Sequence, residues 1–224
     1  MDTAQLEQRL AALPGAKLTV KDHARQGVHL EAALAPETLV EAVEIMDCAG
    51  YFLETVTGID WLGEQEALRK EVLAAREAKA KAKAKAAAEK AKAAKEAHDA
   101  AVEAALAAGE TPPPAPEPEP EPQAAPEPEI PVLEDSMEAV YDFNRYPTKG
   151  DGCRQGLHRV ALRVRVPRSH PEVPTIQHLY PVAHWHERET HDFFGIRFAG
   201  HGYLIPLLLP EDADYHPLRK DYGA

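Results

Sequence analysis

Residues 184–198, HWHERETHDFFGIRF, gather three histidines and two glutamates within eight positions. His184, Glu187 and His191 are spaced i, i+3 and i+7, which places them on one face of a helix. Such a trio could bind a divalent cation weakly, as a stand-alone metal-dependent hydrolase requires. The H-E-x-x-H spacing of a zinc-protease helix is absent, because His186 and His191 lie five residues apart and differ by about 140° around a helix. A solvated polar face is the plainer interpretation, and we favour it.

The other face of this predicted helix is apolar and contains a carboxylate. Its apolar stripe consists of Val182, Trp185 and Phe193. Glu189 lies within the stripe, where a carboxylate is unfavourable unless it is paired or hydrogen-bonded. We therefore expect an arginine to pair with Glu189: Arg197, an arginine of the 159–165 segment, or one from a partner protein. The sequence offers no second acid, nucleophile or cofactor loop that would support a catalytic role for Glu189.

Apolar periodicity predicts the elements that position this helix. The first 63 residues predict a strand–strand–helix–strand unit, with strands at 16–21, 27–34 and 51–62 and a helix at 35–50. A second part predicts strands at 136–146 and 156–167 and a helix at 174–193. The following tail is rich in Gly and Pro, apolar in places and without regular periodicity. Such a tail needs another surface on which to lie.

Residues 64–135 differ in composition from both parts and predict an insertion between them. Residues 64–110 are dominated by Ala, Lys and Glu, which favour a helix of about 70 Å without an apolar stripe. Residues 111–135 contain 10 of the 20 prolines and 7 acidic residues, which is typical of an extended linker. A basic arm for RNA or anionic lipid is the alternative for the helix, and its near neutrality argues against that alternative.

The whole chain of 224 residues has a net charge of −12, which argues against nucleic acid as a partner. Its two cysteines, Cys48 and Cys153, are far apart, so no clustered set for zinc or an iron–sulfur centre is present in the sequence. No signal peptide is visible, and the longest apolar run, 203–209, is much shorter than the roughly 20 residues that cross a bilayer. We expect a soluble protein, or one that is held at a membrane by another component.

The end of the chain carries a long ordered motif, W-x-E-R-E-x-x-D-x-F-G-I-x-F-x-G-H followed by H-P-L-R-K-D. In this motif the chain resembles the C-type subunit of the NADH-quinone oxidoreductase family, respiratory complex I. GIDW at 58–61 and the paired strands at 136–167 extend the resemblance, which covers 1–63 and 136–224. The signature residues, which we expect at the partner interface, are Trp185, Glu187, Arg188, Glu189, Asp192, Phe194, Gly195, Phe198, Gly200, His201, His216, Pro217, Leu218, Arg219, Lys220 and Asp221.

The resemblance implies an α+β domain with a small mixed sheet, helices on one face and a long irregular C-terminal tail. It implies a non-catalytic peripheral-arm subunit without a bound cofactor, packed against the D-type subunit near the quinone site at the cytoplasmic face of a bacterial inner membrane. The membrane would be reached only through the complex, which transfers electrons from NADH to quinone and moves ions. The expected segments are 1–63 and 136–194 for the domain, 64–110 for the helical insertion, 111–135 for the linker and 195–224 for the partner-binding tail.

The segment 200–208 departs from the family pattern G-H-P-x-L-R-R-I-L. This chain lacks the proline and both arginines there, and Ala213 replaces the usual tryptophan. The departure leaves open the equivalent scaffold subunit of a complex I-related membrane-bound [NiFe] hydrogenase.

Overall fold

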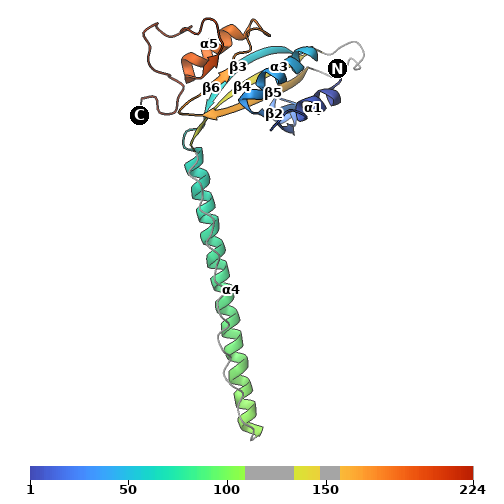
Figure 1. Ribbon diagram of the computed structural model, residues 1–224. Coiled ribbons are helices and arrows are strands. Elements are labelled where there is room, and N and C mark those ends of the chain that lie inside the picture. Colours follow the sequence, from blue (N-terminus) through green and yellow to red (C-terminus); the bar gives the residue numbers. More distant parts are fainter. Residues whose placement is uncertain (109–133, 147–156, 224) are drawn as a thin grey trace. The chain divides into compact units, whose positions relative to one another are not determined.

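The computed structural model describes residues 1–108, 134–146 and 157–223. Two units are present, residues 1–64 with 134–224 and residues 65–133. The strands of the first unit are β1 (Lys17–Val20), β2 (Leu30–Leu34), β3 (Phe52–Asp60), β4 (Ser136–Arg145), β5 (His158–Pro167), β6 (Glu172–Pro174) and β7 (Arg197–Ala199). Its helices are α1 (Thr3–Ala11), α2 (His23–Gln26), the 3-10 helix η1 (Pro36–Thr38), α3 (Leu39–Cys48) and α5 (Ala183–Phe194) (Figure 1).

Five strands form a mixed sheet in the order β1-β2-β5-β4-β3. β2 and β5 pair in parallel, and the other three pairs are antiparallel. β6 and β7 form a separate parallel pair. The prediction of an α+β fold with a small mixed sheet is therefore confirmed.

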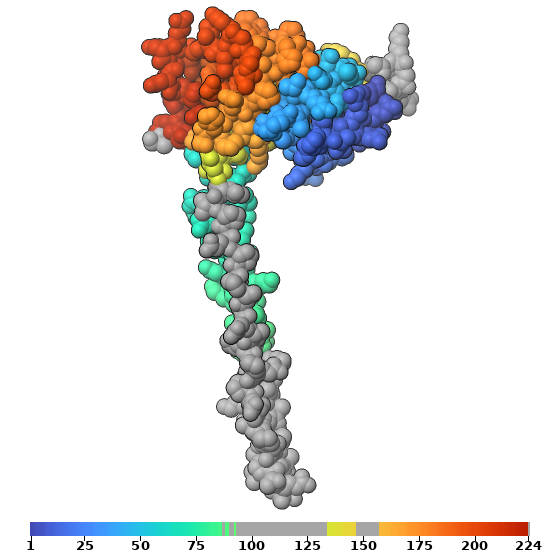
Figure 2. All heavy atoms as spheres, in the orientation of Figure 1, coloured from blue at the N-terminus to red at the C-terminus, as the bar shows by residue number. Residues whose placement is uncertain are grey.

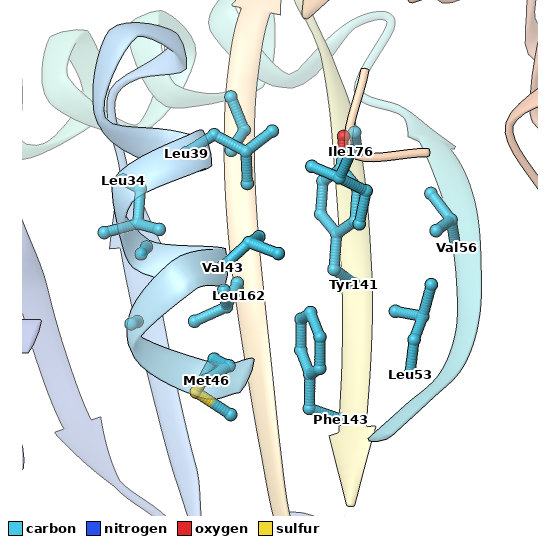
Figure 3. Packing of buried hydrophobic residues seen from close by; sticks show 14 of the residues in the cluster. Leu34, Leu39, Val43, Met46, Leu53, Val56, Tyr141, Phe143, Leu162 and Ile176 are labelled. Atoms are coloured by element: carbon cyan, nitrogen blue, oxygen red, sulfur yellow. The ribbon is translucent and has the colours of Figure 1, made fainter. Parts of the chain in front are cut away.

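Alternation along the strands places the core on one face of the sheet. Tyr141 and Phe143 of β4 point into this core, where Leu39, Val43 and Met46 of α3 pack against the strands (Figure 3). The other face is polar. There Arg163 bridges Glu31 and Glu138 at 3.1 and 3.0 Å, so ion pairs link neighbouring strands on this face.

The helix predicted at 174–193 is wrong in its first half, because α5 begins only at Ala183. Residues 172–174 form β6, and the chain then turns until α5. Pro174 and Pro181 explain the difference, because a proline disfavours helical backbone in the residue before it. The apolar residues between them pack as turns, and Ile176 is fully buried.

The second unit contains helix α4 (Glu64–Ala108), which begins at the last residue of the 1–64 segment. Its 45 residues give a length of about 68 Å. The linker predicted at 111–135 lies outside the described residues except for its last two.

The insertion interrupts a β-hairpin, because Asp60 pairs with Met137 and the Trp61 N–H donates to the Ser136 carbonyl at 3.0 Å. Among the described helices, none is long and apolar enough to cross a membrane.

Candidate partner-binding site

Helix α5 turns a polar face toward the sheet. Glu187 is fully buried and Thr190 is 2% exposed, whereas Trp185 is 55% exposed. The Thr190 hydroxyl donates to the Val56 carbonyl of β3 at 3.0 Å. Phe194 packs on Gly58 of the same strand, where a Cβ would lie 2.6 Å from the ring. The hydrogen bond of Thr190 and the close packing of Phe194 on Gly58 therefore fix the orientation of α5.

This orientation overturns the expectation that Glu189 lies in a buried apolar seam, and its pairing with an arginine of a partner protein stays a prediction. Its apolar neighbours Val182 and Trp185 face outward, so Glu189 lies on the partly exposed side and not in a buried seam. Within the described part of the chain, no ion pair involves Glu189. The buried carboxylate of α5 is Glu187, which accepts from the Thr175 hydroxyl at 2.5 Å and the Ile176 N–H at 2.8 Å. The apolar stripe predicted the wrong buried face of α5, because the polar residues that are buried there form hydrogen bonds with residues outside the helix.

The trio considered as a metal site is not assembled. The His184 ring stacks on His201 at 4.9 Å, and His191 Nδ1–H donates to the Ile196 carbonyl at 3.0 Å. Glu187 points to a different set of donors. No group of three or more potential ligands that could hold a metal occurs in the described ranges.

Two charged side chains of α5 bind the backbone of the tail. Arg188 donates to the carbonyls of Ile205 and Pro206 at 3.0 and 2.9 Å. Asp192 accepts from three successive backbone N–H groups at 2.7, 2.8 and 3.3 Å; they belong to Leu207, Leu208 and Leu209. Both side chains are buried. A tail segment without regular secondary structure is thus fixed by its backbone, since buried amide groups need partners.

The C-terminal end of α5 receives the next part of the tail. Gly195 ends the helix with φ +72°, and a Cβ there would overlap the side chains of His216 and Arg219. His216 Nδ1–H donates to the Asp192 carbonyl at 2.9 Å, and Arg219 Nε–H donates to the Phe194 carbonyl at 2.7 Å. The H-P-L-R-K-D run therefore caps the last turn of α5, where helix carbonyls lack partners of their own.

Asp60, at the end of β3, anchors the last residues of the tail. Arg168 donates to both of its oxygens at 3.1 and 3.2 Å, and the backbone N–H of Lys220 donates at 2.9 Å. Arg168 also donates to Asp221 at 2.7 Å. Burial alone would raise the pKa of Asp60, but the hydrogen bonds from Arg168 and from the backbone of Lys220 and Leu62 hold it below its ordinary value.

The fixed tail leaves apolar side chains facing solvent. We define the outer surface as the exposed large hydrophobic residues of the α5 region and the tail: Val182, Trp185, Tyr203, Ile205, Leu208, Tyr215, Leu218 and Tyr222. Residues 175–223 occupy one side of the first unit (Figure 2). Arg188 lies over the rings of Trp185 and Tyr203 at 5.5 and 5.3 Å, which holds them beside the guanidinium.

Most predicted signature residues bind the tail to the domain, and only some of them face outward. Phe198 is buried in β7, and Gly200 follows at φ +84° against Thr175. Trp185 and Leu218 are exposed. The structure adds residues outside the predicted set: Gly58, Asp60, Arg168 and Thr175. GIDW contains the first two, but nothing in the sequence connects Asp60 to an arginine 108 residues away.

A family model described as "Respiratory-chain NADH dehydrogenase, 30 Kd subunit" matches residues 119–224. The C-type subunit of NADH-quinone oxidoreductase from Mycobacteroides abscessus is 52% identical over 64 residues, 29% of this chain and 28% of that protein. Its counterpart in Roseiflexus castenholzii is 53% identical over 64 residues, 29% of this chain and 37% of that protein. The chain thus spans less than two fifths of these curated relatives. The resemblance predicted from the motifs is confirmed.

Two solved structures also resemble this chain. A chain of the membrane-bound sulfane sulfur reductase, an archaeal respiratory membrane complex, has a TM-score of 0.53 and 17% identity. The match covers 97% of this chain and 83% of that chain, which shows a shared fold. The trypsin-resistant fragment of Nqo5 has a TM-score of 0.47 and 22% identity, over 90% of this chain and 97% of that chain.

Proposed function

Because residues 119–224 match the family of the 30 Kd subunit of the respiratory-chain NADH dehydrogenase, we propose that this chain is a structural subunit of an NADH-quinone oxidoreductase. It would belong to the peripheral arm, at the cytoplasmic face of a bacterial inner membrane. In this proposal it packs against the D-type subunit near the quinone site. Electrons pass from NADH to quinone through other subunits, and this chain contributes neither a catalytic site nor a redox centre.

One observation carries the proposal: eight exposed large hydrophobic residues lie in the α5 region and the tail, while the backbone of the tail is held by polar contacts. Exposed hydrophobic side chains on a fixed backbone are typical of a surface that a partner covers. The backbone is already ordered by Arg188, Asp192 and Asp60, so docking would require little further loss of conformational freedom. Trp185 and Tyr203 are of the residue types that contribute most to such interfaces.

Substitution at the outer surface tests the proposal. Trp185→Ser should weaken binding to the D-type subunit by about 10–100-fold, as for other aromatic residues at the centre of an interface. It should change the stability of the isolated chain little, because the ring is already 55% exposed. Val20→Ser is the matched control, since Val20 is a 73% exposed hydrophobic residue on β1. Equal binding of the two variants to the purified D-type subunit would contradict the proposed interface.

The departure of residues 200–208 from the family pattern leaves a second candidate, the equivalent scaffold role in a complex I-related membrane-bound [NiFe] hydrogenase. The two candidates differ in the partners expected. Affinity purification of the tagged chain from its host, followed by identification of the bound proteins, separates them. An NADH-binding flavoprotein supports the first candidate, and hydrogenase subunits support the second.

A further inference from the structure

Glu187 is a buried acid with no lysine or arginine partner among the residues that the structure describes. Its carboxyl group is fully buried, and its two close donors are the Thr175 hydroxyl and the Ile176 N–H. By contrast, Arg168 pairs with Asp60. Arg188, next to Glu187 in the sequence, binds tail carbonyls instead. Burial raises the pKa of Glu187 to about 7 against the lowering effect of its two hydrogen bonds.

The groups around this carboxyl come from four parts of the first unit. Tyr141 lies on β4, and its buried hydroxyl has no hydrogen-bond partner among the described residues. Burial, and next the charge of Glu187, raise the pKa of Tyr141. Thr175 follows β6. The charged and titratable groups of α5 itself near Glu187 are His184, Arg188 and His191.

The fourth part is the tail, which contributes His201. Its Nε2 lies 4.0 Å from the Glu187 carboxyl and 3.4 Å from the His184 carbonyl. Its Nδ1 accepts the Tyr203 N–H at 3.1 Å. A neutral imidazole with the proton on Nε2 satisfies these contacts, because a protonated Nδ1 could not accept. Burial lowers the pKa of His201, in agreement with a neutral ring.

We propose that Glu187 and His201 form a proton-binding site beneath the outer surface, and that loss of its proton moves the tail at Tyr203. With Glu187 protonated, His201 keeps the hydrogen bond to Tyr203. When the proton leaves to solvent, the buried carboxylate needs further donors. The available donors are Nε2–H of His201 and the free hydroxyl of Tyr141.

Movement of the His201 ring toward the carboxylate lengthens the contact between Nδ1 and the Tyr203 N–H. Tyr203 belongs to the outer surface and stacks with Arg188. Protonation would therefore regulate the docking surface, a consequence that rests on the proposed function. The proton-binding site and its coupling to Tyr203 concern this chain alone.

Infrared and NMR titrations of the full chain test the proposal without a partner. The carboxylic-acid band of Glu187 should disappear near neutral pH, and the Tyr203 amide resonance should shift with the same midpoint. Glu187→Gln should remove both changes, and Glu189→Gln is the matched control that should keep them. A band that titrates at an ordinary glutamate pKa, or a Tyr203 amide that does not follow it, would overturn the proposal.

Thr175→Val provides an independent variant that retains the acid. The hydroxyl of Thr175 favours the ionised form, so its removal should move both midpoints to higher pH. Unchanged midpoints would overturn the assignment to Glu187. Binding of the D-type subunit from pH 6 to 8 then tests the regulation: affinity should change with pH in the wild type and not in Glu187→Gln. Failure to bind at any pH would refute the proposed function alone, because the two titrations do not involve a partner.

Discussion

Asp60→Asn should release the end of the tail while the sheet stays folded. The carboxylate accepts two hydrogen bonds from Arg168 and two from the backbone N–H groups of Leu62 and Lys220. An amide side chain has one acceptor oxygen, and its N–H donors would face the donors of Arg168. The substitution therefore weakens the one contact with the tail, that of the Lys220 N–H, because its acceptor loses its charge, and it leaves the guanidinium without its buried counter-charge.

The loss can be estimated from the geometry. Among the four hydrogen bonds to Asp60, the one from the tail is that of the Lys220 N–H. A hydrogen bond to a charged group contributes about 1.5–3 kcal/mol, and we expect the lower limit, about 1.5 kcal/mol, because the amide keeps one acceptor oxygen. The free energy that holds residues 216–223 against the domain should fall by this amount. The population with a detached tail end then rises by about 10-fold, since each 1.4 kcal/mol is a factor of ten.

Amide hydrogen exchange measures this population directly. Lys220 and Leu218, whose N–H groups bind Asp60 and the Phe193 carbonyl, should exchange about 10-fold faster in the variant, while amides of β4 stay protected. Arg197→Ala is the control, because its pair with Glu172 is exposed at 3.8 Å and contributes less than about 1 kcal/mol. Equal exchange in the two variants would refute the anchoring role of Asp60.

Acid should act as the substitution does. The folded-state pKa of Asp60 is lowered, so its stabilisation is complete above the ordinary value of 3.8 and is lost as pH falls through the lower folded value. Detachment of the tail end through this group is therefore expected only below about pH 4.

Three further outcomes follow from other contacts. Gly58→Ala should destabilise the chain by about 1–3 kcal/mol in denaturant titrations, because its Cβ would lie 2.6 Å from the Phe194 ring. Gly202→Ala is the control and should be nearly neutral, because the atom nearest to its Cβ would lie 3.6 Å away. Equal effects of the two substitutions would refute the close packing of Gly58 against Phe194. Replacing residues 65–133 by a two-residue turn should change the unfolding free energy of the first unit by less than about 1 kcal/mol, since the turn joins the paired strands β3 and β4. Loss of hydrogen-exchange protection at the amides of β3 and β4 would contradict this. The unfolding free energy of the wild type relative to Glu187→Gln should fall by about 3 kcal/mol as pH rises from 4.5 to about 7. The pKa of Glu187 is raised in the folded state, so its stabilisation is complete only below the pKa of the unfolded state. An equal difference between the two proteins at both ends of this range would contradict the titration of a buried Glu187.

The strands could be predicted from the sequence because apolar and polar residues largely alternate along them. In β5, for example, Val160, Leu162 and Val164 face the core while Arg159 and Arg163 face the ion pairs. The pairing of β2 with β5 could not be predicted, since the two strands are about 130 residues apart and nothing local specifies the neighbour. Local patterns specify which face of a strand is buried, and the order of strands depends on the whole fold.

The candidate site was harder to predict for a related reason. Its buried groups are polar, so apolar periodicity assigned the stripe of Trp185 to the core and left Glu187 outside it. The groups that stabilise the buried Glu187 are the Thr175 hydroxyl and the Ile176 N–H. The sequence predicted both residues to lie within the same helix as Glu187, at 174–193, and therefore did not predict these contacts. The motif itself located the right segment, but it did not separate residues that hold the tail from residues that face a partner.

This division of roles explains why the tail contains both charged and apolar residues. Backbone groups of residues 205–209 are bound by Arg188 and Asp192, and the end of the tail is bound by Asp60. Fixing a segment by its backbone leaves its side chains free, so Leu208 and Leu218 remain exposed. A tail held by its own apolar side chains would have buried them in this domain. The polar anchors therefore make an apolar docking surface possible on a segment that has almost no secondary structure.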